Sequence, residues 1–303
     1  MEENKTKKIF HDYVSNGYLK GAGDEKKPKY WDKYTHSLFV MDQALLVDAI
    51  FTKYGDNYKN LLALEALFHD IGRFKQMNVT GTFDDAELKK FYPGMQDHGD
   101  LGVQVMQEDG LLMRLIPELR LYDSEIQKVI KDHSKISTAR LNKDMLNYLK
   151  VFAKYDLQEL FSSSKTEKAV EALTTINTSI VQDVDRLDIF RKIVKGIWIP
   201  MTVDENIDPE IWKMYREGRI PSMNEIKAQG KWNANVGHLV RMSFINQMNL
   251  VPVLIRIREE GLIDKIYKTT GENGPLVQEA YEIAKERLDT KINSSPDGIL
   301  IQK

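Results

Sequence analysis

The stretch Leu67–Phe74 reads LFHDIGRF, and it sets a histidine beside an aspartate at the end of an apolar run. That run, Leu61–Ile71, has the length and composition of a buried helix, and Gly72 after it is a stop signal. Imidazole nitrogen and carboxylate oxygen suit borderline divalent ions such as zinc, iron, manganese, cobalt and nickel. His69 and Asp70 are therefore candidate metal ligands near a helix end.

The rest of the chain follows the helix period. Apolar residues recur mostly at spacings of three and four, and alternating runs of strand length are scarce, so an all-α fold is predicted. The predicted helices span residues 37–54, 61–71, 101–110, 123–130, 145–161, 167–195, 235–261 and 275–292. Pro252 kinks or divides the seventh of these. Residues 73–94 are predicted to form a functional loop. The stretch 199–230, which contains several Pro and Gly residues, is predicted to form loops and short helices.

Composition excludes several classes of protein. The chain has 303 residues, with 42% hydrophobic and 29% charged residues, which excludes wholesale disorder. The net charge of −2 gives no basic field for nucleic acid or an anionic membrane. With no cysteine, the chain has no disulfide, thiolate zinc site, iron–sulfur cluster or cysteine nucleophile. No stretch has the length of a membrane span, and we expect a soluble, cytoplasmic protein.

Four of the six histidines lie at or near the ends of predicted helices. They are His36, His69, His98 and His133, and Asp185 lies within another predicted helix. Their separations are far outside the range of a local motif, so only a fold that gathers these positions makes them a site. A single histidine near a helix end is more often a capping or packing residue. Gathered together, four histidines and two aspartates suit two ions that share a bridging carboxylate.

The string LFHDIGRF resembles the signature of the HD-domain metal-dependent phosphohydrolase superfamily, a group of all-helical proteins. The resemblance covers about residues 34–195 and extends to five further blocks: KYTHSLFVMDQA around His36, TGTFDDAE at Thr80–Glu87, QDHGDLGVQVM around His98, VIKDHSK around His133 and DVDRLDIF around Asp185. TGTFDDAE is similar to a loop of many uncharacterised bacterial members. Met95 and Gln96 depart from the valine and serine of many such relatives, which puts packing or specificity in doubt rather than metal binding.

The resemblance implies an HD-domain helical bundle over residues 1–198, with a helical extension at 199–303 that packs on the core and can shape the substrate pocket. It also implies a ligand set for two ions. The first ion would be bound by His36, His69, Asp70 and Asp185. Asp70 would bridge to a second ion, which His98 and His133 would complete, as in the dinuclear branch of the superfamily.

The chemistry that this resemblance implies is hydrolysis of a nucleotide or another small phosphate ester by a metal-bridging hydroxide. Two alternatives stay open at this point. Some members of the superfamily are mixed-valent di-iron oxygenases with the same four histidines and two aspartates. A sensor that binds metal and nucleotide without catalysis is the third hypothesis, although it would not need the complete ligand set. Iron, manganese, nickel, cobalt and zinc all suit these ligands.

Substrate-binding residues are less marked. Arg73 lies three positions after Asp70, so on a continuing helix it would point to the same side, and we predict a catalytic role for both residues. A guanidinium there can grip a phosphate, although a charge near a helix end has the same appearance. Lys135 is a weaker candidate, with an ordinary exposed lysine as the alternative. His238 and Arg241, three apart in NVGHLVRM, could reach the pocket from a covering helix or be structural.

Overall fold

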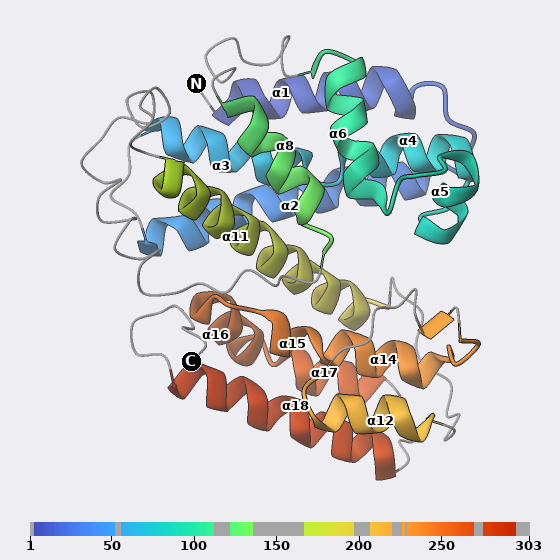
Figure 1. Cartoon of the computed structure of the whole chain (residues 1–303), viewed down its shortest axis with the longest axis vertical. Helices are drawn as coiled ribbons and strands as arrows, with labels where there is room; N and C mark the ends of the chain where they lie inside the picture. The colour runs from blue at the N-terminus through green and yellow to red at the C-terminus, as the bar shows by residue number, and fades with distance from the viewer. Residues whose placement is uncertain are drawn as a thin grey trace. The chain divides into compact units, whose positions relative to one another are not determined.

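The computed structural model describes residues 3–51, 56–111, 122–135, 167–196, 207–219, 226–227, 229–269 and 275–294. Every secondary-structure element in these ranges is a helix, which confirms the predicted all-α class (Figure 1). None of these helices is long and apolar enough to cross a membrane. By compactness the chain divides into Met1–Val184 and Asp185–Lys303, and the division falls inside one helix. The boundary expected between residues 198 and 199 stays a prediction.

The first unit is built from helices that pack in consecutive pairs. They are α1 (Glu3–Val14), the π-helical turn η1 (Ser15–Leu19), α2 (Lys27–Phe51), α3 (Asp56–Phe68), α4 (Ile71–Thr80), α5 (Asp85–Phe91), α6 (His98–Glu108), α8 (Asp123–Asp132) and the part of α11 (Glu167–Val194) before the division. Helix α2 packs along α3, α4 crosses α6, and α6 packs on α8 (Figure 1).

The HisAsp pair forms a corner between two helices. Helix α3 ends at Phe68 and α4 begins at Ile71, so the predicted helix 61–71 ends three residues early, and Gly72 lies inside α4 rather than stopping a helix. The predicted loop at 73–94 is also wrong, because α4 and α5 occupy most of it. Ile71, Phe74 and Met77 are buried at a spacing of three, which is the period of a short amphipathic helix.

The aromatic residues of LFHDIGRF hold this corner against α1. Phe68 and Phe74 are fully buried. The ring centroid of Phe10, on α1, lies 5.2 Å from that of Phe68 and 6.0 Å from that of Phe74, both in edge-on geometry. Edge-on aromatic pairs add directional packing to the burial of apolar area. The residues on both sides of the HisAsp pair are therefore anchored in the core.

Glycines allow α4, α6 and α8 to approach one another at backbone distance. A Cβ added to Gly72 on α4 would stand 2.6 Å from the amide nitrogen of Gly102 on α6. A Cβ added to Gly99 on α6 would stand 2.6 Å from the carbonyl oxygen of Lys131 on α8. Both distances are below any that real Cβ atoms adopt, so only glycine fits. This close crossing brings the start of α6 to the α3–α4 corner and to the end of α8.

Buried amides attach α11 to the same region. Asn177 donates to Oε2 of Glu65 on α3 at 2.7 Å and accepts from the hydroxyl of Tyr58 at 3.0 Å. Gln182, one turn before Asp185, donates to the carbonyl oxygens of Asp132 and Lys135 at 2.8 and 2.9 Å. These bonds to α8 bring α11 beside the residue that follows α8, His133.

The second unit holds the later helices: α12 (Pro209–Arg216), α14 (Ala234–Met242), α15 (Phe244–Gln247), α16 (Val251–Glu259), α17 (Leu262–Thr269) and α18 (Pro275–Asn293). The hydroxyl of Tyr215 donates to the carbonyl of Ala280 on α18 at 2.6 Å. Lys291 on α18 donates at 2.8–2.9 Å to the carbonyls of Ile245, Asn246 and Met248, which end α15.

Four of the eight predicted helices agree with the structure to within a few residues. Those at 101–110, 123–130, 167–195 and 275–292 correspond to α6, α8, α11 and α18. The helix predicted at 37–54 begins earlier, at Lys27, and the one at 235–261 is divided into three, with Pro252 in the first turn of α16. The helix predicted at 145–161 lies outside the described residues.

Candidate metal centre

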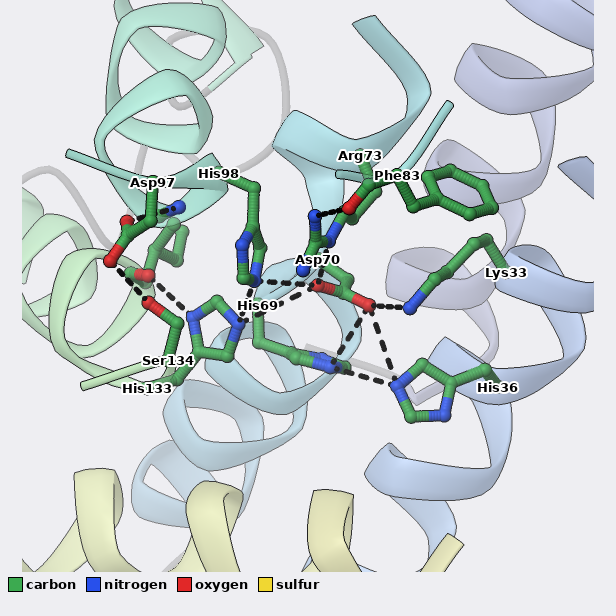
Figure 2. Close-up of polar contacts among 12 residues, drawn as sticks. Lys33, His36, His69, Asp70, Arg73, Phe83, Asp97, His98, His133 and Ser134 are labelled. Atoms are coloured by element: carbon green, nitrogen blue, oxygen red, sulfur yellow. Dashed lines mark hydrogen bonds and ion pairs between the residues drawn. The ribbon is translucent and has the colours of Figure 1, made fainter. Parts of the chain in front are cut away.

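The carboxylate of Asp70 lies between two pairs of histidines (Figure 2). Its Oδ2 is 3.5 Å from Nε2 of His36 and 3.8 Å from Nε2 of His69. Its Oδ1 is 3.3 Å from Nε2 of His98 and 3.5 Å from Nε2 of His133. All five side chains are buried. A carboxylate that turns one oxygen toward each pair has the geometry of a bridge between two ions.

The two imidazoles within each pair also face each other through Nε2. The Nε2 atoms of His36 and His69 are 3.2 Å apart, and those of His98 and His133 are 3.1 Å apart. Each pair joins two helices or helix ends, namely α2 with the α3–α4 corner, and the start of α6 with the end of α8. The structure therefore brings together all four histidines that the sequence singled out.

Backbone carbonyls fix the tautomer of two of these histidines. Nδ1 of His69 donates to the carbonyl of Ala66 at 2.6 Å, and Nδ1 of His133 donates to the carbonyl of Ile130 at 2.6 Å. Because a carbonyl only accepts, the ring proton is on Nδ1 and the Nε2 lone pair points to the centre. Ligand histidines in metal sites are typically oriented in this way, through the nitrogen that does not bind the ion.

The remaining aspartate joins this set from α11. Donor atoms of His36, His69 and Asp185 all lie within 4.8 Å of one another, as do those of His69, Asp70 and His133. Asp185 is half-buried and lies on α11. Two groups of nitrogen and carboxylate donors that share His69 match the preferences of borderline divalent ions, so the residues present fit such ions.

The ammonium group of a buried lysine contacts Oδ2 of Asp70. Nζ of Lys33 is 2.6 Å from Oδ2, and its side chain is 11% exposed. Burial alone would raise the pKa of Asp70, but the charge of Lys33 and the facing histidines outweigh it and hold that pKa well below its usual value. The carboxylate is therefore ionised at neutral pH and available as a ligand.

An arginine lies near the other oxygen. Nε of Arg73 is 3.8 Å from Oδ1 of Asp70, so the two side chains point to the same side, as their spacing predicts. Its Nη1 donates to the side chain of Gln76 at 2.8 Å, to the carbonyl of Phe83 at 2.7 Å and to Oδ1 of Asp85 at 2.8 Å. The guanidinium thus joins the centre to the segment before α5, and its role as a phosphate clamp stays a prediction.

The other predicted substrate residues are Lys135, His238 and Arg241. Nζ of Lys135 donates to Asp132 at 2.8 Å, and the side chain lines a polar hollow of about 480 Å³ that also includes Gln96 and Lys131. His238 and Arg241 lie on α14 of the second unit. His238 is buried with no hydrogen-bond partner at Nε2, and burial followed by the charge of Arg241 lowers its pKa to about 4. Their roles in substrate binding stay predictions.

Sequence reasoning missed two residues that touch this cluster, Lys33 and Asp85. Lys33 precedes His36 by three positions, which is the spacing of one helix face, so its direction was readable once His36 was a candidate. Asp85 lies in TGTFDDAE, where nothing in the local pattern distinguishes it from Asp84. Only the fold of the segment around α4 and α5 brings it to His98.

A comparison with protein-family models matches the HD domain to residues 34–189, more than half of the chain. The chain therefore belongs to the HD-domain family, which confirms the resemblance of its motifs. HD domains bind divalent metals, and members of the family are typically metal-dependent phosphohydrolases. No curated protein and no solved structure gives a significant match.

Proposed function

We propose that this protein is a dinuclear metal-dependent phosphohydrolase that acts on a nucleotide or another small phosphate ester. The observation that carries the proposal is the position of Asp70, with Oδ2 toward His36 and His69 and Oδ1 toward His98 and His133. A mononuclear site needs one of these pairs, whereas two pairs on opposite oxygens of one carboxylate suit two ions.

The proposed ligands of the first ion are His36, His69, Asp70 and Asp185, and those of the second are Asp70, His98 and His133. When bound, a pair of divalent ions supplies a hydroxide near neutral pH and neutralises charge on the phosphoryl oxygens. Manganese, iron, cobalt, nickel and zinc all suit these donors. The chain contributes fixed tautomers at His69 and His133, whose Nδ1 protons are committed to backbone carbonyls.

Charge beside the centre favours a phosphate ester over the alternative of dioxygen chemistry. Lys33 and Arg73 approach opposite oxygens of Asp70, at 2.6 and 3.8 Å. An ammonium carries three donors, of which Asp70 takes one, so Lys33 can also bind a phosphoryl oxygen. Two cations beside the centre add to the positive charge that attracts a dianionic phosphate, whereas binding of neutral dioxygen gains nothing from them. A di-iron oxygenase with the same ligands remains the second candidate.

The test compares Lys33→Met with Lys27→Met, a matched loss of one lysine at the exposed start of α2. Both proteins are loaded with manganese, and we measure metal content, hydrolysis of p-nitrophenyl phosphate and a nucleotide panel, and binding of inorganic phosphate by calorimetry. Lys33→Met should keep its metal and bind phosphate about 10–100-fold more weakly, the worth of one charge-assisted hydrogen bond. Lys27→Met should match the wild type.

Unchanged phosphate binding in a metal-loaded Lys33→Met protein would remove Lys33 from the substrate site. Hydrolysis of none of the esters by the loaded wild type, together with substrate-dependent oxygen consumption by the iron form, would replace the phosphohydrolase with the oxygenase.

A further inference from the structure

We infer that Asp85 is a positioning residue, whose carboxylate holds the His98 ring so that Nε2 faces the second ion of the centre. The inference rests on the proposed dinuclear function. It assigns a role to the start of α5, a helix that contributes none of the proposed metal ligands.

The geometry around Asp85 joins two parts of the centre. Its Oδ2 is 3.3 Å from Nδ1 of His98, and its Oδ1 is 2.8 Å from Nη1 of Arg73 and 3.3 Å from Nε2 of Gln76. The side chain is 17% exposed. A carboxylate paired with a guanidinium only accepts hydrogen bonds, so Nδ1 of His98 is the donor in its contact with Asp85.

His98 needs this outside acceptor because of its position on its helix. His69 and His133 follow the last turns of α3 and α8, where the carbonyl three residues back accepts from Nδ1. His98 is the first residue of α6, so no helical carbonyl precedes it. The carboxylate of Asp85 therefore accepts from Nδ1 of His98, as backbone carbonyls do for His69 and His133.

The segment that carries Asp85 is itself fixed by hydrogen bonds. Gly81 ends α4 with a φ of 72°, in the left-handed region that favours glycine. The hydroxyl of Thr80 donates to the carbonyl of Thr82 at 2.8 Å, and the hydroxyl of Thr82 accepts from the amide of Asp84 at 3.3 Å. Asp84 then caps α5 by accepting from the amide of Ala86 at 3.0 Å. Asp85 is thereby held at the first position of α5.

Two consequences follow for the centre. An imidazole that donates to a carboxylate is more basic at its other nitrogen and is held in one tautomer, and both effects strengthen metal binding. Loss of such a partner typically weakens metal affinity about 10–100-fold. Because Asp85 contacts His98 and not the histidines on the other oxygen of Asp70, its loss should weaken the second ion and leave the first unchanged.

The experiment uses the full chain as wild type, Asp85→Ala and Asp85→Asn, with Asp84→Asn as the matched control. Asparagine still caps a helix, and Asp84 does not contact His98, so the control removes one charge from the same turn. Cobalt(II) binding is followed by calorimetry. Ring ¹⁵N chemical shifts, recorded on metal-free protein, report the tautomer of His98.

Asp85→Ala should lose the Nδ1–H tautomer of His98 and bind the second cobalt ion about 10–100-fold more weakly, with the first step unchanged. Asp85→Asn keeps an acceptor oxygen and should fall in between, and Asp84→Asn should match the wild type. An unchanged tautomer and an unchanged second step in Asp85→Ala would overturn the inference. A wild type that binds one ion would instead contradict the dinuclear function, and the tautomer in metal-free protein would still decide the role of Asp85.

Discussion

The crossing of α4 and α6 leads to a prediction about Gly72→Ala. Alanine is the better helix former, so an exposed change of this kind inside a helix would stabilise by up to about 1 kcal/mol. Gly72 is different, because its new Cβ would stand 2.6 Å from the amide nitrogen of Gly102, where ordinary contact begins at 3.4 Å, and closer still to the carbonyl oxygen of His98.

Both obstacles are backbone atoms, which cannot rotate aside, so the helices must separate by about 0.8 Å or more. Overpacking of a core costs about 1–3 kcal/mol, and a backbone obstacle belongs at the upper end. After the helix-propensity gain, the expected net loss is about 2 kcal/mol. For a chain of 303 residues, with an unfolding entropy of about 2.1 cal/mol/K per residue, that corresponds to a melting temperature about 3 °C lower.

The assay is thermal unfolding of metal-free protein, followed by circular dichroism. Gly17→Ala is the matched control, because nothing lies within 4 Å of the Cβ it would add on η1. That variant should melt at or slightly above the wild type. A Gly72→Ala protein that melts as high as the wild type would refute the close crossing, and with it the packing that brings His98 to Asp70.

Three further predictions concern two buried polar groups and one half-buried helix cap. Glu65→Gln should be more stable than the wild type above about pH 5. Burial raises the pKa of Glu65 well above its usual value, so the unfolded chain releases a proton that the native state retains. Urea unfolding at pH 5 and pH 8 should show a larger gain in stability at pH 8. His238 has a pKa lowered to about 4, so the unfolded chain takes up a proton before the native protein does as the pH falls. The wild type should therefore lose about 3 kcal/mol of stability between pH 6.5 and pH 4. His238→Gln should abolish that loss, and an identical pH dependence in both proteins would contradict the buried neutral imidazole. Asp97→Ala should lower the free energy of unfolding in urea by about 1–2 kcal/mol. Oδ1 of Asp97 caps α6 by accepting from the amides of Gly99 and Asp100, and Oδ2 accepts from the hydroxyl of Ser134. A loss below about 0.5 kcal/mol would show that this cap does not help to hold His98 in place.

The gathering of the four histidines was readable from the sequence because they stand in recognisable blocks at helix ends. Periodicity located α6, α8, α11 and α18, and the family's motif order assigned His36, His98 and His133 to one site. These positions are separated by tens of residues, so spacing without the resemblance would have left each histidine a capping or packing residue. The structure adds the division of Asp70's oxygens between two histidine pairs, which no linear pattern encodes.

The two errors around Gly72, the helix stop and the loop after it, have one physical source. Glycine can end a helix, but it can also allow two helices to approach closely. Gly72 suggested a helix stop, and the residues after it suggested a loop, but the missing side chain permits the backbone contact with α6. With α4 and α5 predicted as a loop, the direction of Asp85 could not be predicted, and neither could its contact with Arg73. Lys33 was missed for a simpler reason, since its partner Asp70 lies 37 residues further along the chain.

The metal content of the protein tests the central claim most directly. Wild type and His98→Ala are purified without chelator, and their metal is measured by elemental analysis per chain. The position of Asp70 between two histidine pairs predicts about two ions in the wild type and about one in His98→Ala. One ion in both proteins would contradict the dinuclear centre, and no metal in either after reconstitution would contradict the metal site altogether.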